Sequence, residues 1–397
     1  MNVKSRTIWA RMHGVLLALS STRRDFLDFA GDYLSPLRVY EKTSLATGAV
    51  DAIETVCGRS PVTSPSSFRI DAHDAVSTPD IRVTLAWKIG RGHGTTFSVA
   101  GEERQQLGRR LWISDHRLGI TAIWQLPGLA MEVFWEHDHL SVRATYTWPS
   151  RRARWASHWL PAVRERLFVG LIYYLVYFPW GWWLERERGW TMMHAAAVTE
   201  GGRGIILAGL PGSGKSSTTL AFLNRSGWRI LSDNLLFTDG RRVFACLEPI
   251  HVDQRTAQLV GGMSGWAHST GRQFSHHRWD YEIPPEARGS AAMSRVLGFL
   301  RIGERTEVRR LPLADSLRRL MANDYLAKEW LAYQETAAML HQLFPRIGDQ
   351  TRRRENLLFL VGSSSCYQIA LARDTSLQSE LDYVLAKVWR TGQGGAE

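Results

Sequence analysis

Cysteine is scarce in this chain of 397 residues, which has only Cys57, Cys246 and Cys366. The three lie far apart in the sequence and match no metal-site or disulfide spacing. This excludes a disulfide framework and a cysteine-rich zinc module. It favours a reducing compartment, and we expect a cytoplasmic protein.

Lysine is also scarce. Six of the 49 basic residues are lysines, so arginine carries nearly all of the positive charge behind a formal net charge of +11. Such a balance favours an anionic partner, which could be nucleic acid, an acidic peptide or a membrane surface. No stripe alternates basic and aromatic residues as nucleic-acid modules do, so nucleic acid is not expected. An arginine-rich solvated surface is the favoured interpretation.

Long unbroken apolar runs are missing as well. Residues 14–19 follow three basic residues and loosely imitate a signal peptide, but the apolar core is short and no convincing cleavage site follows. Residues 167–183 are uncharged, but Pro179 and Gly181 break the run, which is at the lower limit for a membrane span. The pattern predicts a buried helix under the nucleotide domain and no transmembrane span. Peripheral membrane contact through its aromatic end stays open.

The most informative stretch matches G-x-x-x-x-G-K-[ST], the pattern of a loop whose backbone amides wrap a phosphate. An apolar run at 204–208 before it predicts a buried strand. Residues 217–226 after it predict a helix, with Gly227 as a left-handed stop. This order points amides and a helix N-terminus at a polyphosphate, which by itself allows an ATPase, a GTPase or a kinase. The residues expected to bind the polyphosphate are Gly209, Leu210, Pro211, Gly212, Ser213, Gly214, Lys215, Ser216 and Ser217.

Three side chains are expected to carry the chemistry at this loop. Lys215 would hold the β- and γ-phosphate oxygens, and the Ser216 hydroxyl would ligate Mg²⁺. Asp233 ends an apolar strand eighteen residues beyond Lys215. A parallel arrangement would place its carboxylate at the sheet edge beside the loop. There Asp233 could hold Mg²⁺ or accept the proton of an attacking hydroxyl; the alternative is a helix-capping or turn residue.

The rest of the chain predicts an α/β protein in three parts. Residues 1–150 form a mainly antiparallel β domain with flanking helices, residues 151–190 a helical linker, and residues 191–397 a phosphate-loop domain with a mixed sheet. Short β-branched or aromatic segments mark the strands of the first part. They are 68–72, 81–86, 95–100, 111–114, 119–124, 130–135 and 140–146.

In the third part, two hairpins surround the loop, one at 192–208 and one around Asp239-Gly240. Residues 253–290 lack periodicity and are expected to be a loop or lid. Beyond them the sequence predicts a polar connection containing Arg352–Arg354. The expected regular elements there are a strand at 296–302, helices at 314–322 and 326–343, a strand at 367–371 and a final helix at 377–389.

His194 followed by Ala-Ala-Ala-Val, the glycine loop, and Ile-Leu-Ser before Asp233 together resemble the catalytic core of HPr kinase/phosphorylase and its kinase relatives. These relatives include kinases that phosphorylate serine on ribosomal peptides such as lasso peptides. The resemblance covers about 60 residues, 192–253. It implies that Asp233 is the general base, that His194 lines the site, and that Lys215 and Ser216 serve ATP and Mg²⁺. It also implies a homo-oligomer, because the HPr kinases are hexameric.

The sequence departs from that family in two places. Ser232 replaces the first Asp of its Asp-Asp pair, and the Leu-Glu-x-Arg-Gly signature is missing. Glu248 is the remaining candidate for a second Mg²⁺ contact. Nearby histidines have no metal-site spacing and are interpreted as surface residues. They are His251, His268, His276 and His277.

The leading hypothesis is therefore an ATP- and Mg²⁺-dependent kinase that phosphorylates a hydroxyl, most plausibly serine of a peptide or protein. A kinase acting on an amino acid, sugar or other metabolite is the first alternative. The second is a nucleotide-dependent sensor or assembly ATPase. The acceptor, the preference for ATP over GTP, the reverse reaction and the role of the β domain are not determined by the sequence.

Overall fold

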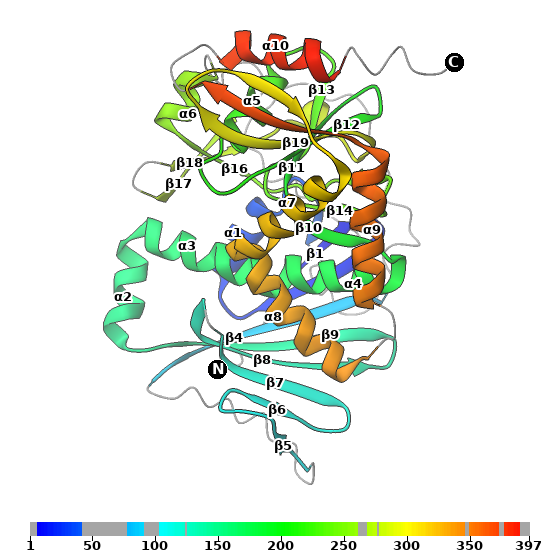
Figure 1. The fold of residues 1–397 in the computed structure, drawn as a ribbon. Coiled ribbons are helices and arrows are strands. Elements are labelled where there is room, and N and C mark those ends of the chain that lie inside the picture. Colours follow the sequence, from blue (N-terminus) through cyan, green and yellow to red (C-terminus); the bar gives the residue numbers. More distant parts are fainter. Residues whose placement is uncertain are drawn as a thin grey trace, which may run out of the picture. The chain divides into compact units, whose positions relative to one another are not determined.

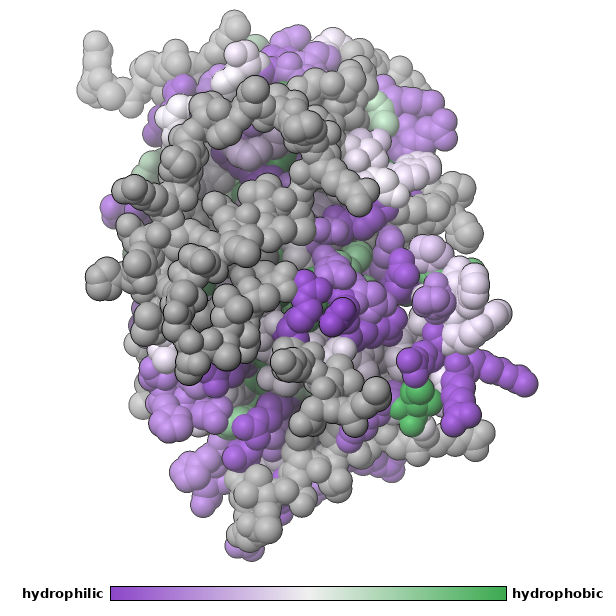
Figure 2. All heavy atoms as spheres, turned by 180° about the vertical axis from the view of Figure 1, so that it is seen from behind, coloured by the Kyte–Doolittle hydropathy of each residue, from purple (hydrophilic) through white to green (hydrophobic). Residues whose placement is uncertain are grey.

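The computed structural model describes residues 6–41, 78–90, 103–123, 125–260, 268–275, 278–345, 349–372 and 377–389. The chain divides into two compact units, Met1–Trp180 with Thr336–Pro345 and Gly181–Glu335 with Arg346–Glu397. Both units are mixed α/β, with helices packed on sheets that contain parallel and antiparallel pairs (Figure 1). On the face seen in Figure 2, the described residues are mainly hydrophilic, and hydrophobic ones form small separate spots.

The first unit is built on a nine-stranded sheet in the order β3-β1-β2-β4-β9-β8-β7-β6-β5. Its strands are β1 (Arg6–Met12), β2 (Val15–Ser21), β3 (Arg38–Glu41), β4 (Ile81–Ile89), β5 (Gln105–Gln106), β6 (Leu111–Ile113), β7 (Arg117–Ile123), β8 (Leu126–Glu136) and β9 (His139–Trp148). β4 is parallel to both β2 and β9, and the other pairs are antiparallel. The strands expected at 68–72 and 95–100 lie outside the described residues.

Local chemistry explains the first hairpin. His13 and Gly14 both have positive φ, as the two-residue turn with the correct twist for a hairpin requires. The apolar segment after the turn is β2, which is buried within the sheet. Helices cover the sheet through an aromatic cluster in which Phe26 packs edge-on against Trp87 and Phe168. These helices are α1 (Arg24–Tyr33) and α3 (Pro161–Ile172); α2 (Arg151–Trp159) precedes α3 in the chain.

The apolar run at 167–183 belongs to one long helical stretch. α3 continues through a π-helical turn, η2 (Tyr173–Tyr177), into α4 (Phe178–Arg188). Among the described residues, Pro161–Arg188 is long and apolar enough to cross a membrane, but 83% of its most apolar window is buried inside the protein. That burial agrees with the expected core helix.

The second unit also contains a nine-stranded mixed sheet, in the order β10-β14-β15-β19-β12-β11-β13, with β21 pairing to β19 and β20 to β21. Its strands are β10 (Thr191–His194), β11 (Ala196–Glu200), β12 (Arg203–Ala208), β13 (Trp228–Ser232), β14 (Leu235–Thr238), β15 (Arg242–Phe244), β19 (Ala291–Gly303), β20 (Glu307–Arg310) and β21 (Ser365–Ala372). Its helices are α5 (Lys215–Leu223), α6 (Gln254–Leu259), α7 (Leu313–Leu326), α9 (Asp349–Ser363) and α10 (Leu377–Val388), together with α8 (Lys328–Leu343) up to Glu335, after which the first unit's segment begins.

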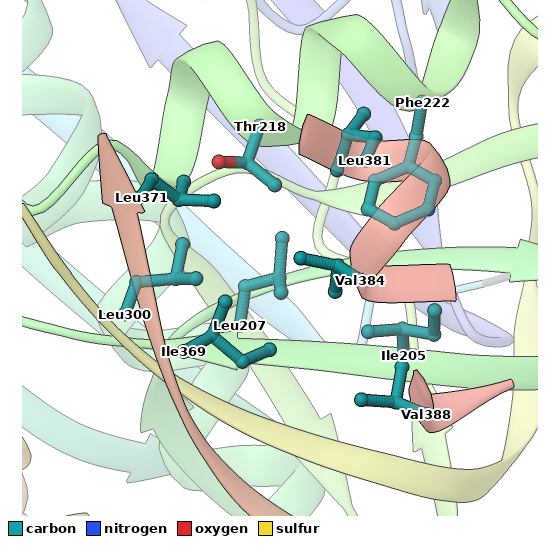
Figure 3. Close-up of a pocket in the computed structure, with 10 residues that line it drawn as sticks. All are labelled: Ile205, Leu207, Thr218, Phe222, Leu300, Ile369, Leu371, Leu381, Val384 and Val388. Carbon is teal, nitrogen blue, oxygen red and sulfur yellow. The ribbon is translucent and has the colours of Figure 1, made fainter. Parts of the chain in front are cut away.

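Strand alternation gives this sheet two buried faces. Ile206 and Ala208 point into a core shared with α7 and α9, while Ile205 and Leu207 point into a core shared with α5 and α10. The second core contains a cavity of about 10 Å³, lined by Thr218 and apolar side chains (Figure 3). This void is barely large enough for one water molecule, so we treat it as a packing defect and not as a binding site.

Two expectations about this unit are wrong. Residues 253–290 are not one loop, because a three-stranded sheet forms there from β16 (Ile250–Asp253), β17 (His268–Ser275) and β18 (Arg278–Glu282). The apolar side chains of β16 pack on α5, which is about 30 residues earlier in the chain, so the sequence around β16 shows no periodic pattern of its own. Arg352–Arg354 do not lie in a connection, because they belong to α9.

Candidate active site

The phosphate loop connects β12 to α5, as the sequence predicts. Gly212 and Gly214 have φ of +83° and +93°, values that side chains other than glycine rarely adopt. A Cβ on Gly209 would collide with the Ser213 side chain. The three glycines therefore let the backbone curl tightly in front of the N-terminus of α5.

Lys215 is the first residue of α5 and is only 8% exposed. Its ammonium donates a hydrogen bond to the Gly209 carbonyl, so the side chain lies across the loop. Burial lowers the pKa of Lys215, and the carboxylates of Asp233 and Glu329 oppose that shift. The loop thus encloses a cation where a polyphosphate would need one.

Asp233 lies beside the loop for a topological reason. β12 and β13 are both antiparallel to β11, so they run in the same direction and end at the same edge of the sheet. The Ser216 hydroxyl donates a hydrogen bond of 2.8 Å to Asp233 Oδ2. Asp233 Oδ1 is buried and has no hydrogen-bond partner among the described residues. One carboxylate oxygen is thus fixed, and the other is available.

The charge state of Asp233 depends on its surroundings. Burial raises its pKa, and the Ser216 hydroxyl, the Lys215 ammonium and His251 oppose that rise. A buried carboxylate with a raised pKa is a stronger proton acceptor than one in water. Asp233 therefore combines an oxygen that has no hydrogen-bond partner among the described residues with a carboxylate whose pKa burial raises.

His194 ends β10 and is 4% exposed. Neither ring nitrogen has a hydrogen-bond partner among the residues that the structure describes. Burial and then the charge of Lys215 lower the pKa of His194 to about 3. The imidazole is therefore neutral at physiological pH.

Side chains replace a neighbouring strand along one edge of β10. The His194 backbone N–H donates to Asp324 Oδ1 at 3.0 Å, and its carbonyl accepts from Asn323 Nδ2 at 2.7 Å. The Met192 N–H likewise donates to Glu185 Oε1 at 2.9 Å. These bonds fix the strand that carries His194. Among the described strands, β10 pairs with β14, which lies on its other edge.

Arg353 holds this edge together. Its guanidinium donates to the Met192 carbonyl at 2.6 Å and to Asp324 Oδ2 at 2.7 Å. It also lies 3.7 Å from a carboxylate oxygen of Glu185 and 3.7 Å from the centroid of the Trp330 ring. Burial raises the pKa of Asp324 to about 6, and Arg353 and the His194 N–H oppose the rise. Asp324 therefore depends on Arg353 for its negative charge.

The oxygen atoms at the loop suit Mg²⁺. Ser216 and Asp233 offer a hydroxyl and a carboxylate, donors that Mg²⁺ takes together with phosphate oxygens and water. Within the described residues, no group of three or more His, Cys, Asp or Glu side chains could hold a metal by itself. Glu248 is buried just before β16, and its charge helps to raise the pKa of Cys246. Its role as an Mg²⁺ ligand stays a prediction.

The sequence did not reveal a histidine–aspartate pair near Asp233. His251 on β16 and Asp280 on β18 face each other across the small sheet, with Nδ1 and Oδ1 2.7 Å apart. Asp280 is 2% exposed, and His251, expected at the surface, has a side chain only 23% exposed. Without a prediction of β16 and β18, no local signal could have paired them. Of the other expected surface histidines, His276 and His277 lie outside the described residues.

Comparison with known proteins adds little to this geometry. No family model and no curated protein matches the chain. Among solved structures, it is similar to the HPr(Ser) kinase/phosphatase from Coxiella burnetii, with 9% sequence identity and a TM-score of 0.27 over 51% of this chain and 99% of that chain. A TM-score of this size carries no argument, so the chemistry of the site must be inferred from its own residues.

The buried His194 and Asp324 should give stability opposite dependences on pH. The folded pKa of His194, about 3, is below its usual 6.5, so its contribution falls as the pH drops from 6.5 toward 3. The folded pKa of Asp324, about 6, is above its usual 3.8, so stability rises as the pH drops through 6. Against wild type, His194→Gln should retain about 3 kcal/mol more stability at pH about 4 than at pH about 7.

Urea unfolding across this pH range tests the prediction. Asp324→Asn should show the reverse, a steeper loss of stability on the acid side. His116→Gln, at an exposed histidine, is the matched control and should follow the wild-type curve. Parallel pH curves for His194→Gln and wild type would contradict the prediction.

Proposed function

We propose that this protein is an ATP-dependent kinase that transfers the γ-phosphoryl group to a hydroxyl, most plausibly of serine in a peptide or protein. One observation carries the proposal. Asp233 is bonded through one oxygen to Ser216 of the phosphate loop, and its other oxygen is buried without a partner among the described residues. A site that only binds or hydrolyses nucleotide has less need of a second, available carboxylate oxygen.

The residues divide the work between the two substrates. The loop amides and Lys215 bind the phosphates and offset the charge that develops on the transferring group. Asp233 Oδ1 accepts the hydroxyl proton as the acceptor oxygen attacks the γ-phosphorus, the bond from that phosphorus to the β,γ-bridging oxygen breaks, and ADP leaves. Mg²⁺, held through Ser216 and Asp233 with Glu248 as a further proposed ligand, would neutralise phosphate charge when bound. Because His194 is neutral, it adds no second positive charge near Lys215.

Label transfer from γ-labelled ATP to pools of peptides and of small metabolites tests this function. We expect label on a peptide or protein hydroxyl and a rate about 10²-fold lower for Lys215→Met, since one such contact supplies roughly 3 kcal/mol. Lys88→Met, at an exposed lysine, is the matched control and should keep the wild-type rate.

Two outcomes would redirect the proposal. Label on a metabolite and on no peptide would make the protein a small-molecule kinase. Nucleotide hydrolysis without transfer to any acceptor would instead support a nucleotide-dependent sensor or assembly ATPase.

A further inference from the structure

Helix α2 turns its small residues toward the protein and exposes its tryptophans, the reverse of what an ordinary surface helix does. Its small residues face inward, with Ser157 buried and Ala153 and Ala156 half-buried, while Trp155 and Trp159 are 65% and 63% exposed. An ordinary surface helix turns its apolar stripe toward the core. Two tryptophans on the outer face therefore indicate that this face meets something other than water.

The apolar surface continues into α3. Leu160 is 54% exposed and Val163 is 50% exposed, and the rings of Trp155 and Trp159 lie 6.0 Å apart. Four large apolar side chains thus stand in solvent within nine consecutive residues, at the corner where α2 meets α3 (Figure 1). Exposed apolar patches of this kind mark interaction sites.

Positive charge borders these side chains. Arg151, Arg152, Arg154 and Arg166 are exposed on the same two helices as these apolar side chains. Residues 149–170, all of them described, contain a single carboxylate, Glu165, and it is buried. The exposed charge of the segment is therefore of one sign and complements an extended anionic surface.

We propose that this α2–α3 surface, made of Arg151, Arg152, Arg154, Trp155, Trp159, Leu160, Val163 and Arg166, binds the surface of an anionic lipid bilayer. Tryptophan favours the boundary between headgroups and acyl chains, and arginine binds lipid phosphates beside it. The outward corner of two helices presents these groups to a flat partner. The inference is independent of the proposed kinase activity, because it uses no residue of the phosphate loop.

Co-sedimentation of the full chain with vesicles, without nucleotide, tests the inference. We expect binding to phosphatidylcholine vesicles containing phosphatidylglycerol, no binding to phosphatidylcholine alone, a blue shift of tryptophan emission, and release by salt. Arg151→Gln and Arg152→Gln should each weaken binding about fivefold. Trp155→Ala with Trp159→Ala should abolish the binding and the shift.

Controls separate a loss of binding from a loss of structure. Arg318→Gln with Arg319→Gln removes two exposed arginines from α7 and should leave vesicle binding unchanged. Circular dichroism should show that the tryptophan variant is folded, and the arginine variants test the surface independently. Failure of the wild type to bind anionic vesicles would overturn the inference. So would equal binding by all variants, or self-association lost in the tryptophan variant, which would assign the surface to a second copy of the chain.

Discussion

Asp233→Asn is expected to lower phosphoryl transfer about a thousandfold, while ATP binding in the absence of Mg²⁺, which Asp233 would help to hold, changes little. Asparagine keeps an oxygen that can accept the hydrogen bond from Ser216, so the loop should retain its geometry. It has no carboxylate to take the proton of the acceptor hydroxyl. The measurement is kcat for label transfer at saturating ATP, alongside nucleotide affinity from calorimetry.

Asp382→Asn removes an exposed carboxylate from α10 and is the matched control, for which we expect wild-type transfer. Transfer that survives Asp233→Asn would sink the assignment of Asp233 as base. His251, paired with Asp280 and close enough to act on the charge of Asp233, would then be the first group to test in its place.

Arg353→Met is expected to destabilise the protein by about 3–5 kcal/mol at neutral pH. The substitution leaves Asp324 buried without its ion-pair partner, and breaking one side of such a pair costs far more than removing both sides. Its pKa, already raised to about 6, should rise further, so the loss should shrink as the pH falls and Asp324 takes up a proton. Urea unfolding as a function of pH measures both effects.

The double variant Arg353→Met with Asp324→Asn should recover part of that stability, because the buried charge of Asp324 is removed together with its partner. Arg354→Met changes an exposed arginine on the same helix and should cost little. An equal loss for Arg354→Met, or no recovery in the double variant, would show that the Arg353–Asp324 pair is not what holds the edge of β10.

Much of the second unit could be predicted from local sequence. The glycine loop requires its own spacing and backbone angles, so the strand, loop and helix could be predicted from residues 204–226 alone. Asp233 could be placed beside the loop for two reasons. The apolar run before it predicts a strand, and strands that run in the same direction, as β12 and β13 do, end at the same edge of a sheet. The hairpin around Asp239-Gly240 formed as expected, with Asp239 accepting hydrogen bonds from two backbone N–H groups.

The sequence-based predictions were wrong where the secondary structure of a segment depends on packing against residues distant in the chain. Ile250 and Val252 are too few to show a period, and they are buried against Leu220 and Leu223 of α5. The loop or lid expected at 253–290 therefore forms part of a small sheet. The expected polar connection at Arg352–Arg354 is a helix for a similar reason, because its buried face meets the sheet through Leu357, Leu360 and Val361.

By itself, the sequence determined the glycine loop between a strand and a helix and the strand that ends at Asp233, because both follow from short-range patterns. Only the tertiary structure decided how His194 is held, since Asp324 is 130 residues away in the chain and Arg353 contacts Met192 across 161 residues. It likewise decided that the small residues of α2 turn inward and its tryptophans outward. Side chains that are distant in sequence meet only when strands and helices have packed, and no local pattern encodes that meeting.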